Sequence, residues 1–281
     1  MLVSNPFAEL STTISPGLMQ AYLWLMILFV AGGTLFDIVH KQSAVYFFRN
    51  MKAAKSSSSR QVNGGEMAAL AVKTLAVDVA TSAEFCNRHR RIAHLFTMYG
   101  FIAYVLSTAI MVLGYPTAAD VTPVIWSLLW TLGALAVCFG GYWFWFFIRV
   151  DVAAEGQSPL RLMRADLFIL SLLGSATFGL VWAYVQHAGG GGFWSSVFLF
   201  LYLVSTTVLF GSVPWSKLSH MFFKPAAAFE KRVSEANGSA QNLPTLTRDD
   251  PEQKQRHSME LLRDAPTDMG LGIKREAPRH Y

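Results

Sequence analysis

The chain has 281 residues, of which 53% are hydrophobic and 15% are charged, and its mean hydropathy is +0.35. Soluble domains carry about 25% charged residues, so this composition indicates an integral membrane protein and leaves no stretch for a soluble catalytic domain. The formal net charge of +5 is explained by basic loops on one side of a membrane and requires no nucleic-acid partner.

Five stretches are long and apolar enough to cross a bilayer, which takes roughly 20 residues of helix. They cover residues 18–39, 92–114, 121–148, 167–186 and 193–213. We therefore expect an all-α bundle of five transmembrane helices, preceded by a short N-terminal segment, 1–17. No basic residue comes before the first stretch, so we expect it to be a retained helix rather than a cleaved signal peptide.

The distribution of Lys and Arg predicts the orientation. Basic residues crowd the connection 40–91, are absent from 115–120, return between the third and fourth stretches, are absent again from 187–192, and return after the fifth. Because positively charged loops stay in the cytoplasm, this alternation predicts a periplasmic N-terminus and a cytoplasmic C-terminus. The expected location is the bacterial inner membrane, crossed several times.

Two segments outside the membrane have distinct patterns. Within the cytoplasmic connection, apolar residues alternate with a polar line at helical spacing over 66–85, which predicts an amphipathic helix lying on the membrane or on a partner protein. The tail, 224–281, is rich in charged and polar residues. Such a composition buries too little apolar surface to fold alone, so we expect the tail to be disordered.

Cysteine spacing and motif content exclude several kinds of site. Cys86 and Cys138 are the two cysteines, and neither has a partner at the spacing of a zinc or iron–sulfur site. The chain contains neither a Walker-type phosphate loop nor an H-E-x-x-H zinc motif.

Two histidines are the candidate ligands of a metal cofactor. His94 falls one turn inside the second stretch, and His220 follows the fifth. These helices are expected to run antiparallel, so both imidazoles would reach the cytoplasmic boundary, where two neutral imidazoles can ligate one b-type haem axially. The alternative is two interfacial histidines that do not meet.

Three segments also resemble a known family. The stretch Arg90–Phe101, the stretch Arg164–Phe168 and the stretch Pro214–Met221 resemble nitrate-reductase gamma-type cytochromes b. The likeness is strongest to the branch of sulfur metabolism, which includes the membrane domain of the quinone-interacting subunit QmoC and the adenylylsulfate reductase membrane anchors (AprM-like). It covers residues 17–225, and a five-helix chain without a ferredoxin-like front end is more similar to the anchors.

The resemblance implies an electron-transfer subunit of a respiratory complex. It would link cytoplasmic flavin and iron–sulfur subunits, of the adenylylsulfate reductase type, to the quinone pool, and would not be catalytic alone. By position His94 and His220 match the inner haem ligands of the family, whereas the outer pair is replaced by Tyr104 and Tyr202. At most one haem b is therefore expected. For the tyrosines we expect packing between helices, with a quinone-binding hydroxyl as the alternative.

Two other functions stay open at this point. The chain would be a cofactor-free docking anchor if no haem binds. A small transporter is the further alternative, although the helices lack the deep charges and the Pro/Gly-broken helix pair of a midplane substrate site.

Overall fold

The computed structural model describes residues 4–40, 43–83, 88–149, 160, 162, 166–189, 192–215 and 220–240. These residues form helices, and five of the helices are long and apolar enough to cross a membrane. The predicted all-α, multi-pass fold is confirmed to that extent. The five spans are α2 (Pro16–His40), α5 (Arg88–Gly114), α6 with the π-helical turn η2 (Val124–Ile148), α8 (Leu167–Gly189) and α9 (Phe193–Gly211).

The chain divides into two compact units. The first comprises residues 1–43 and 76–223 and contains all five spans. The second comprises residues 44–75 and 224–281, of which those up to 240 are described.

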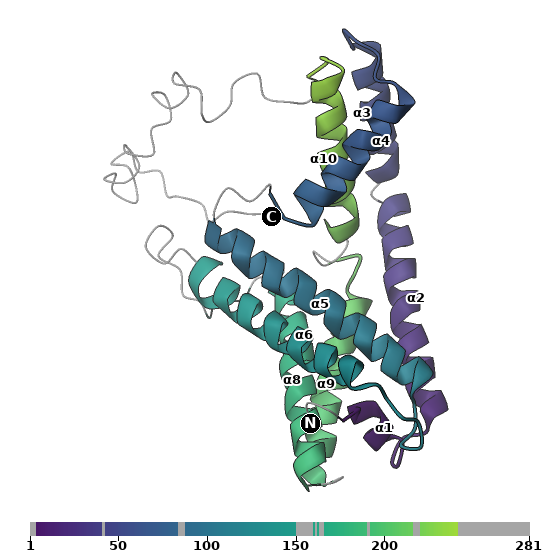
Figure 1. Ribbon diagram of the computed structural model, residues 1–281, viewed down its shortest axis with the longest axis vertical. Helices are drawn as coiled ribbons and strands as arrows, with labels where there is room; N and C mark the ends of the chain where they lie inside the picture. Colours follow the sequence, from purple (N-terminus) through teal and green to yellow (C-terminus); the bar gives the residue numbers. More distant parts are fainter. Residues whose placement is uncertain are drawn as a thin grey trace, which may run out of the picture. The chain divides into compact units, whose positions relative to one another are not determined.

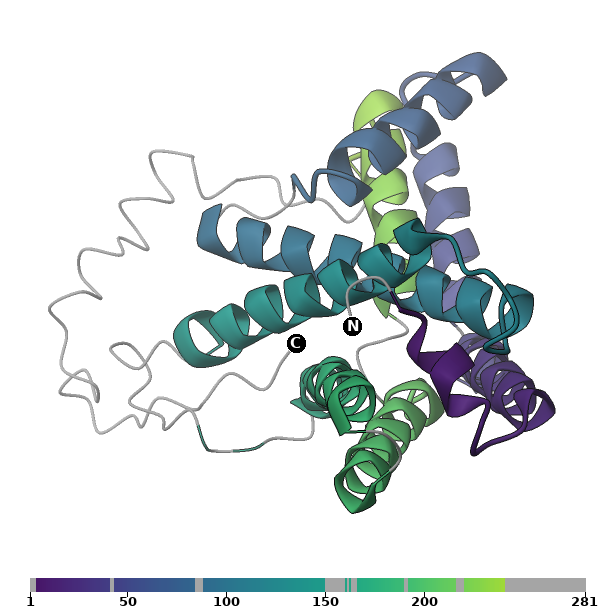
Figure 2. The same cartoon turned by 60° about the horizontal axis from the view of Figure 1, so that its bottom comes forward.

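In the first unit, α5 and α6 run side by side (Figures 1 and 2). Glycines make the close approach possible. A Cβ on Gly100 would lie 2.7 Å from the carbonyl oxygen of Gly133, and one on Gly140 would lie 2.5 Å from that of Ala93. Small residues at such crossings allow two membrane helices to pack backbone to backbone, where lipid supplies no hydrophobic driving force.

Helix α8 packs against both α9 and α6. At the end of η2 (Phe144–Ile148), Arg149 donates through Nε to Asp166 Oδ1 at 2.7 Å, and its guanidinium lies 4.1 Å from the centre of the Trp145 ring. Both charged side chains are buried. This ion pair therefore joins the end of the third span to the start of the fourth.

A short helix that the sequence reading did not predict, α1 (Pro6–Leu10), covers one end of the bundle. Asn5 caps it, accepting from the backbone N–H groups of Phe7 and Ala8, while its amide donates to the Tyr115 carbonyl at 2.9 Å. Phe7 and Leu10 are buried in the core. An Asn followed by Pro at the first helical position is a recognised start signal for a helix, and it was available in the sequence.

The second unit is built from α3 (Ser43–Ser56), α4 (Gly64–Lys73) and the main part of α10 (His220–Ala236). The end of α10 is tied to α3 and to the residues after it. The Asn237 amide donates to the Ala54 carbonyl at 3.1 Å, and the backbone N–H groups of Ser59 and Arg60 donate to the Asn237 carbonyl. Gly238 follows with φ +70, a left-handed conformation that commonly ends a helix and favours glycine.

Two predictions about these segments need correction. The expected disorder from residue 224 onward is wrong up to Ala236, where α10 forms and is tied to α3 by hydrogen bonds of Asn237 and Asn50; residues 241–281 lie outside the described part. The helix expected over 66–85 starts at Gly64, turns π-helical at Thr74 and ends at Val79. Glu84 and Phe85 lie outside the described residues.

Candidate functional site: an apolar cavity in the membrane bundle

The first predicted site residue, His94, lies on the exposed side of α5. Its Nδ1 is 3.0 Å from the hydroxyl of Ser82, which also lies 3.4 Å from the Val79 carbonyl. If Ser82 donates to that carbonyl, it accepts from Nδ1–H, and the lone pair of the imidazole is then on Nε2. A hydrogen-bond partner on the nitrogen that does not bind the metal fixes the tautomer of a ligating histidine. Ser82 adopts φ +50, a conformation that is costly for a residue other than glycine.

The second predicted site residue, His220, is the first residue of α10. Its side chain lies outside the described part of the structure, so the predicted pairing with His94 stays a prediction. Among the described residues, no group of three or more His, Cys, Asp and Glu side chains gathers as in a metal site. The haem and its ligands therefore stay a prediction.

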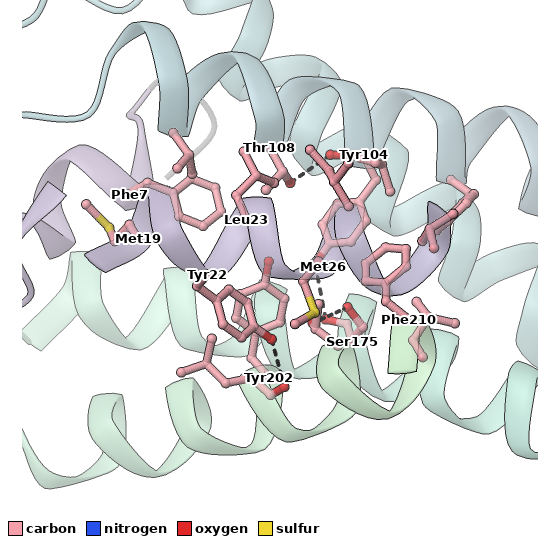
Figure 3. Close-up of a pocket in the computed structure, with 18 of the residues that line it drawn as sticks. Phe7, Met19, Tyr22, Leu23, Met26, Tyr104, Thr108, Ser175, Tyr202 and Phe210 are labelled. Atoms are coloured by element: carbon pink, nitrogen blue, oxygen red, sulfur yellow. Dashed lines mark hydrogen bonds between the residues drawn. The ribbon is translucent and has the colours of Figure 1, made fainter. Parts of the chain in front are cut away.

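A large cavity in the described part of the first unit lies elsewhere, between α2 and the helices α5 and α9 (Figure 3). It measures about 810 Å³. Phe7 and Met19 lie toward one end of it and Phe210 toward the other. Ligand pockets commonly measure about 300–1,000 Å³, so this cavity is large enough for a small organic ligand with part of an apolar tail.

The cavity exists because α2 packs only loosely against the rest of the bundle. Only 11% of its most apolar window is buried, compared with 44% for α6 and for α8. Helix α2 contacts the other helices at separate places along its length. The Tyr22 hydroxyl donates to the Leu203 carbonyl of α9 at 3.0 Å, and a Cβ on Gly33 would lie 2.9 Å from the Val213 side chain. The loose packing of α2 leaves the cavity open beside these contacts.

Tyr104 and Tyr202, which the sequence placed at the positions of the missing outer ligands, meet in its wall. They are 3% and 5% exposed. The Tyr104 hydroxyl donates to the Ser175 carbonyl at 3.3 Å and interacts with the Tyr202 hydroxyl. The Ser175 and Thr206 hydroxyls lie 2.9 Å apart beside them. Buried hydroxyls of α5, α8 and α9 therefore gather at one place in an apolar wall.

Aromatic rings hold the two tyrosines in position. Tyr104 packs on Trp130 with ring centroids 5.4 Å apart, and Tyr202 stacks on Trp182 at 5.7 Å. Gly179 of α8 supplies the room, because a Cβ there would lie 2.8 Å from the Tyr104 hydroxyl oxygen. The two tyrosines thus pack between helices, as expected, and they also line the cavity.

The lining limits what the cavity can bind. The residues that line it include no Asp, Glu, Lys, Arg or His, and its polar groups are hydroxyls. Leu18 and Leu35, on the α2 side, are largely exposed, so a ligand dissolved in the bilayer can reach the cavity sideways. The site thus suits a neutral amphiphile with hydrogen-bond acceptors. It does not suit an ion or a charged metabolite, because burying an unpaired charge is very costly.

Two polar side chains near the end of α2 are buried or line the cavity. Asp37 is buried. One turn earlier, the Thr34 hydroxyl lines the cavity and forms no hydrogen bond within the described part of the chain.

Comparisons of the chain with protein-family models, with curated proteins and with solved structures found no match.

Proposed function

We propose that the chain is a quinone-binding membrane anchor. The observation that supports this best is the apolar cavity in which the buried hydroxyls of Tyr104 and Tyr202 face each other. A quinone combines an apolar ring and tail with two carbonyl oxygens that accept hydrogen bonds. Tyrosine hydroxyls can donate to such carbonyls, and in a low-dielectric surrounding these bonds are stronger than in water.

The Tyr104 hydroxyl can turn from its present partner to a ligand at a small cost in free energy. The Tyr104 hydroxyl bonds to the Ser175 carbonyl, which lies within α8, where the backbone carbonyls are already engaged by the helix. Redirecting the hydroxyl toward a ligand therefore leaves no buried acceptor wholly unpaired. The ring would lie against Tyr104 and Tyr202, and the tail would follow the apolar face of α2 toward the bilayer.

The partner in this proposal follows from the family resemblance of the sequence. Cytoplasmic flavin and iron–sulfur subunits of the adenylylsulfate reductase type would dock on the side that carries the basic loops and exchange electrons with the bound quinone. The alternation of Lys and Arg supports this orientation, with the N-terminus periplasmic, in a bacterial inner membrane. His94 and His220 would hold one b-type haem as an electron relay near that surface.

The test is a binding titration of the purified chain with decyl-ubiquinone and with a short-tailed menaquinone, followed by quenching of the intrinsic Trp fluorescence. Trp130 and Trp182 pack directly on the two tyrosines, so a ring in the site quenches them. Tyr104→Phe and Tyr202→Phe should each weaken binding about tenfold, since a hydrogen bond in a buried site contributes about 1–1.5 kcal/mol. Tyr184→Phe, on an exposed face of α8, is the matched control. Equal affinity in all four proteins would exclude the tyrosine site.

The alternatives predict other outcomes. A cofactor-free docking anchor predicts no quinone binding and an unchanged ability to recruit the reductase to membranes. A cavity filled only by phospholipid chains predicts that quinone does not compete with them. Transport of a charged solute is not favoured, because no charged residue lines the described cavity.

A further inference from the structure

Helix α3 of the second unit has an exposed face that nothing in the proposed function uses. Five side chains on it are exposed: Val45, Phe48, Arg49, Lys52 and Lys55. Their spacing of three and four residues places them on one side of a helix. Phe48 is 69% exposed and Val45 is 52% exposed. The apolar groups lie in the first part of this surface and the basic groups in the rest of it; we call the whole surface the α3 face.

The other side of α3 is already covered. Ala54 is buried and its carbonyl accepts from Asn237, and Asn50 forms a side-chain hydrogen bond with Glu230 of α10. The helix is thus held in its unit by one side, and the exposure of the α3 face is a property of the folded module.

The basic groups of the α3 face have no counter-charge. Within the residues that the structure describes, the charged groups of Arg49, Lys52 and Lys55 form no ion pair or hydrogen bond, and α3 contains no acidic residue. The acidic groups described in this unit have other partners: Glu66 pairs with Arg60, Glu230 bonds to Asn50, and Glu235 lies 4.0 Å from Lys231. Three unpaired cations are thus available to an anionic partner.

We propose that the α3 face binds the phosphate headgroups of anionic phospholipids. Helix α3 begins at Ser43, directly after α2, a membrane span that ends at His40, so its first turns must lie close to a bilayer surface. Basic residues in this position attract anionic lipid, and exposed aromatic and aliphatic side chains insert at the boundary between headgroups and acyl chains. Val45 and Phe48, in the turns nearest to α2, would insert there, and Arg49, Lys52 and Lys55 would bind the headgroups. This inference is independent of the quinone site.

The test uses the full chain in nanodiscs of phosphatidylcholine, with or without phosphatidylglycerol, and measures hydrogen–deuterium exchange of the α3 amides. Phosphatidylglycerol should slow exchange in α3 about tenfold, and high salt should reverse the effect, because salt screens charges that lie near the surface. The triple variant Arg49→Gln/Lys52→Gln/Lys55→Gln should lose the difference between the two lipids.

The control variant Lys73→Gln/Lys231→Gln removes exposed charges from α4 and α10 and should respond to the lipid as the unaltered chain does. The salt titration of the unaltered chain tests the proposal even where the triple variant fails to fold. Equal exchange in both lipids, or equal slowing in the triple variant, would overturn the proposal. Protection of α3 that appears only when an acidic protein is added would overturn it in favour of a protein partner.

Discussion

The ring of Tyr202 lies parallel to that of Trp182, with centroids 5.7 Å apart and an angle of 9° between the planes. This stack fixes the tyrosine on α9 against α8, and the hydroxyl is thereby held beside Tyr104 in the wall of the cavity. The proposed site depends on this arrangement. The hydroxyls of its wall come from α5, α8 and α9, and its opposite side is the loosely packed α2.

The wall of the cavity can be altered at Gly179. In Gly179→Ala, the new Cβ would lie 2.8 Å from the Tyr104 hydroxyl oxygen and 3.4 Å from the Tyr202 ring. We expect the hydroxyl to be displaced, at a cost of about 1–3 kcal/mol in stability, and quinone affinity to fall. Gly32→Ala on α2 meets no atom within 4 Å and serves as the control. Both are checked by thermal unfolding and by the fluorescence titration; equal results for the two variants would contradict the close packing at Gly179.

The buried pair of Arg149 and Asp166 should be sensitive to the loss of one partner. Arg149→Met leaves the Asp166 carboxylate buried without its cation, and we expect a loss of about 3–5 kcal/mol. The double variant Arg149→Met/Asp166→Leu should recover most of that loss, since a buried ion pair can often be replaced by apolar side chains. Unfolding in mixed detergent micelles measures both. A double variant as unstable as the single one would show that the ion pair has no apolar substitute.

The second unit should depend on Asn237. Asn237→Ala removes the bonds of its side chain to the Ala54 carbonyl and to the Ser239 N–H. Leaving a buried acceptor unpaired costs about 1–3 kcal/mol, so the end of α10 should exchange amide hydrogens faster and be cut sooner by protease. Ser57→Ala, which loses an exposed hydroxyl, should change neither. Unaltered exchange in Asn237→Ala would contradict the packing of α10 on α3.

The stability of this unit should also depend on pH through Glu230. Burial raises the pKa of Glu230 above 4.5, its ordinary value, and a hydrogen bond from Asn50 partly offsets the rise. A raised pKa means that the folded state binds the proton more tightly, so the contribution is present at low pH and is lost as pH rises through the folded pKa. Glu230→Gln should therefore be more stable than the unaltered chain at pH 7, and the difference should shrink as pH falls toward the ordinary value. Amide exchange in α10, measured across this range, checks the sign; a difference that grows on acidification would contradict it.

The predicted haem gives a spectroscopic test. If haem binds, a dithionite-reduced minus oxidised spectrum should show a b-type band at up to one haem per chain, which His94→Ala and His220→Ala abolish. Ser82→Ala should keep the band and shift its midpoint potential, because Ser82 lies on Nδ1 of His94 and such partners tune a ligand. His187→Ala is the control: it removes a histidine that is not a predicted ligand, and it should keep the band. A well-folded His94→Ala protein with a full band would refute the ligand assignment, and a colourless protein would favour the cofactor-free anchor.

Local sequence signals predicted the spans well, since hydropathy is a property of consecutive residues. The predicted 167–186 and the observed Leu167–Gly189 begin at the same residue, and 92–114 and Arg88–Gly114 end at the same one. The segments outside the membrane were less predictable. Helix α10 and the residue after it form hydrogen bonds with α3, which lies far away in the sequence, and composition alone does not reveal such a contact.

The cavity was not predictable from the sequence, although two of its residues had been singled out. Tyr104 and Tyr202 were identified by their positions relative to His94 and His220, but their meeting depends on how α5, α8 and α9 pack. The loose packing of α2 cannot be recognised from its sequence, because α2 is as apolar as the other spans. The described lining contains no charged residue because of which helix faces meet around the cavity, and the sequence alone does not give those faces.

The most direct test of the quinone site is photoaffinity labelling of the full chain in lipid nanodiscs with an azido-quinone, followed by mapping of the labelled peptides. The label should appear on peptides of α2 and α9 that line the cavity, around Tyr22 and Tyr202, and an excess of unlabelled quinone should suppress it. Tyr104→Phe and Tyr202→Phe should reduce it. Labelling confined to the outer, lipid-facing surfaces, and unchanged by competitor or by either variant, would contradict the proposal that this cavity binds a quinone.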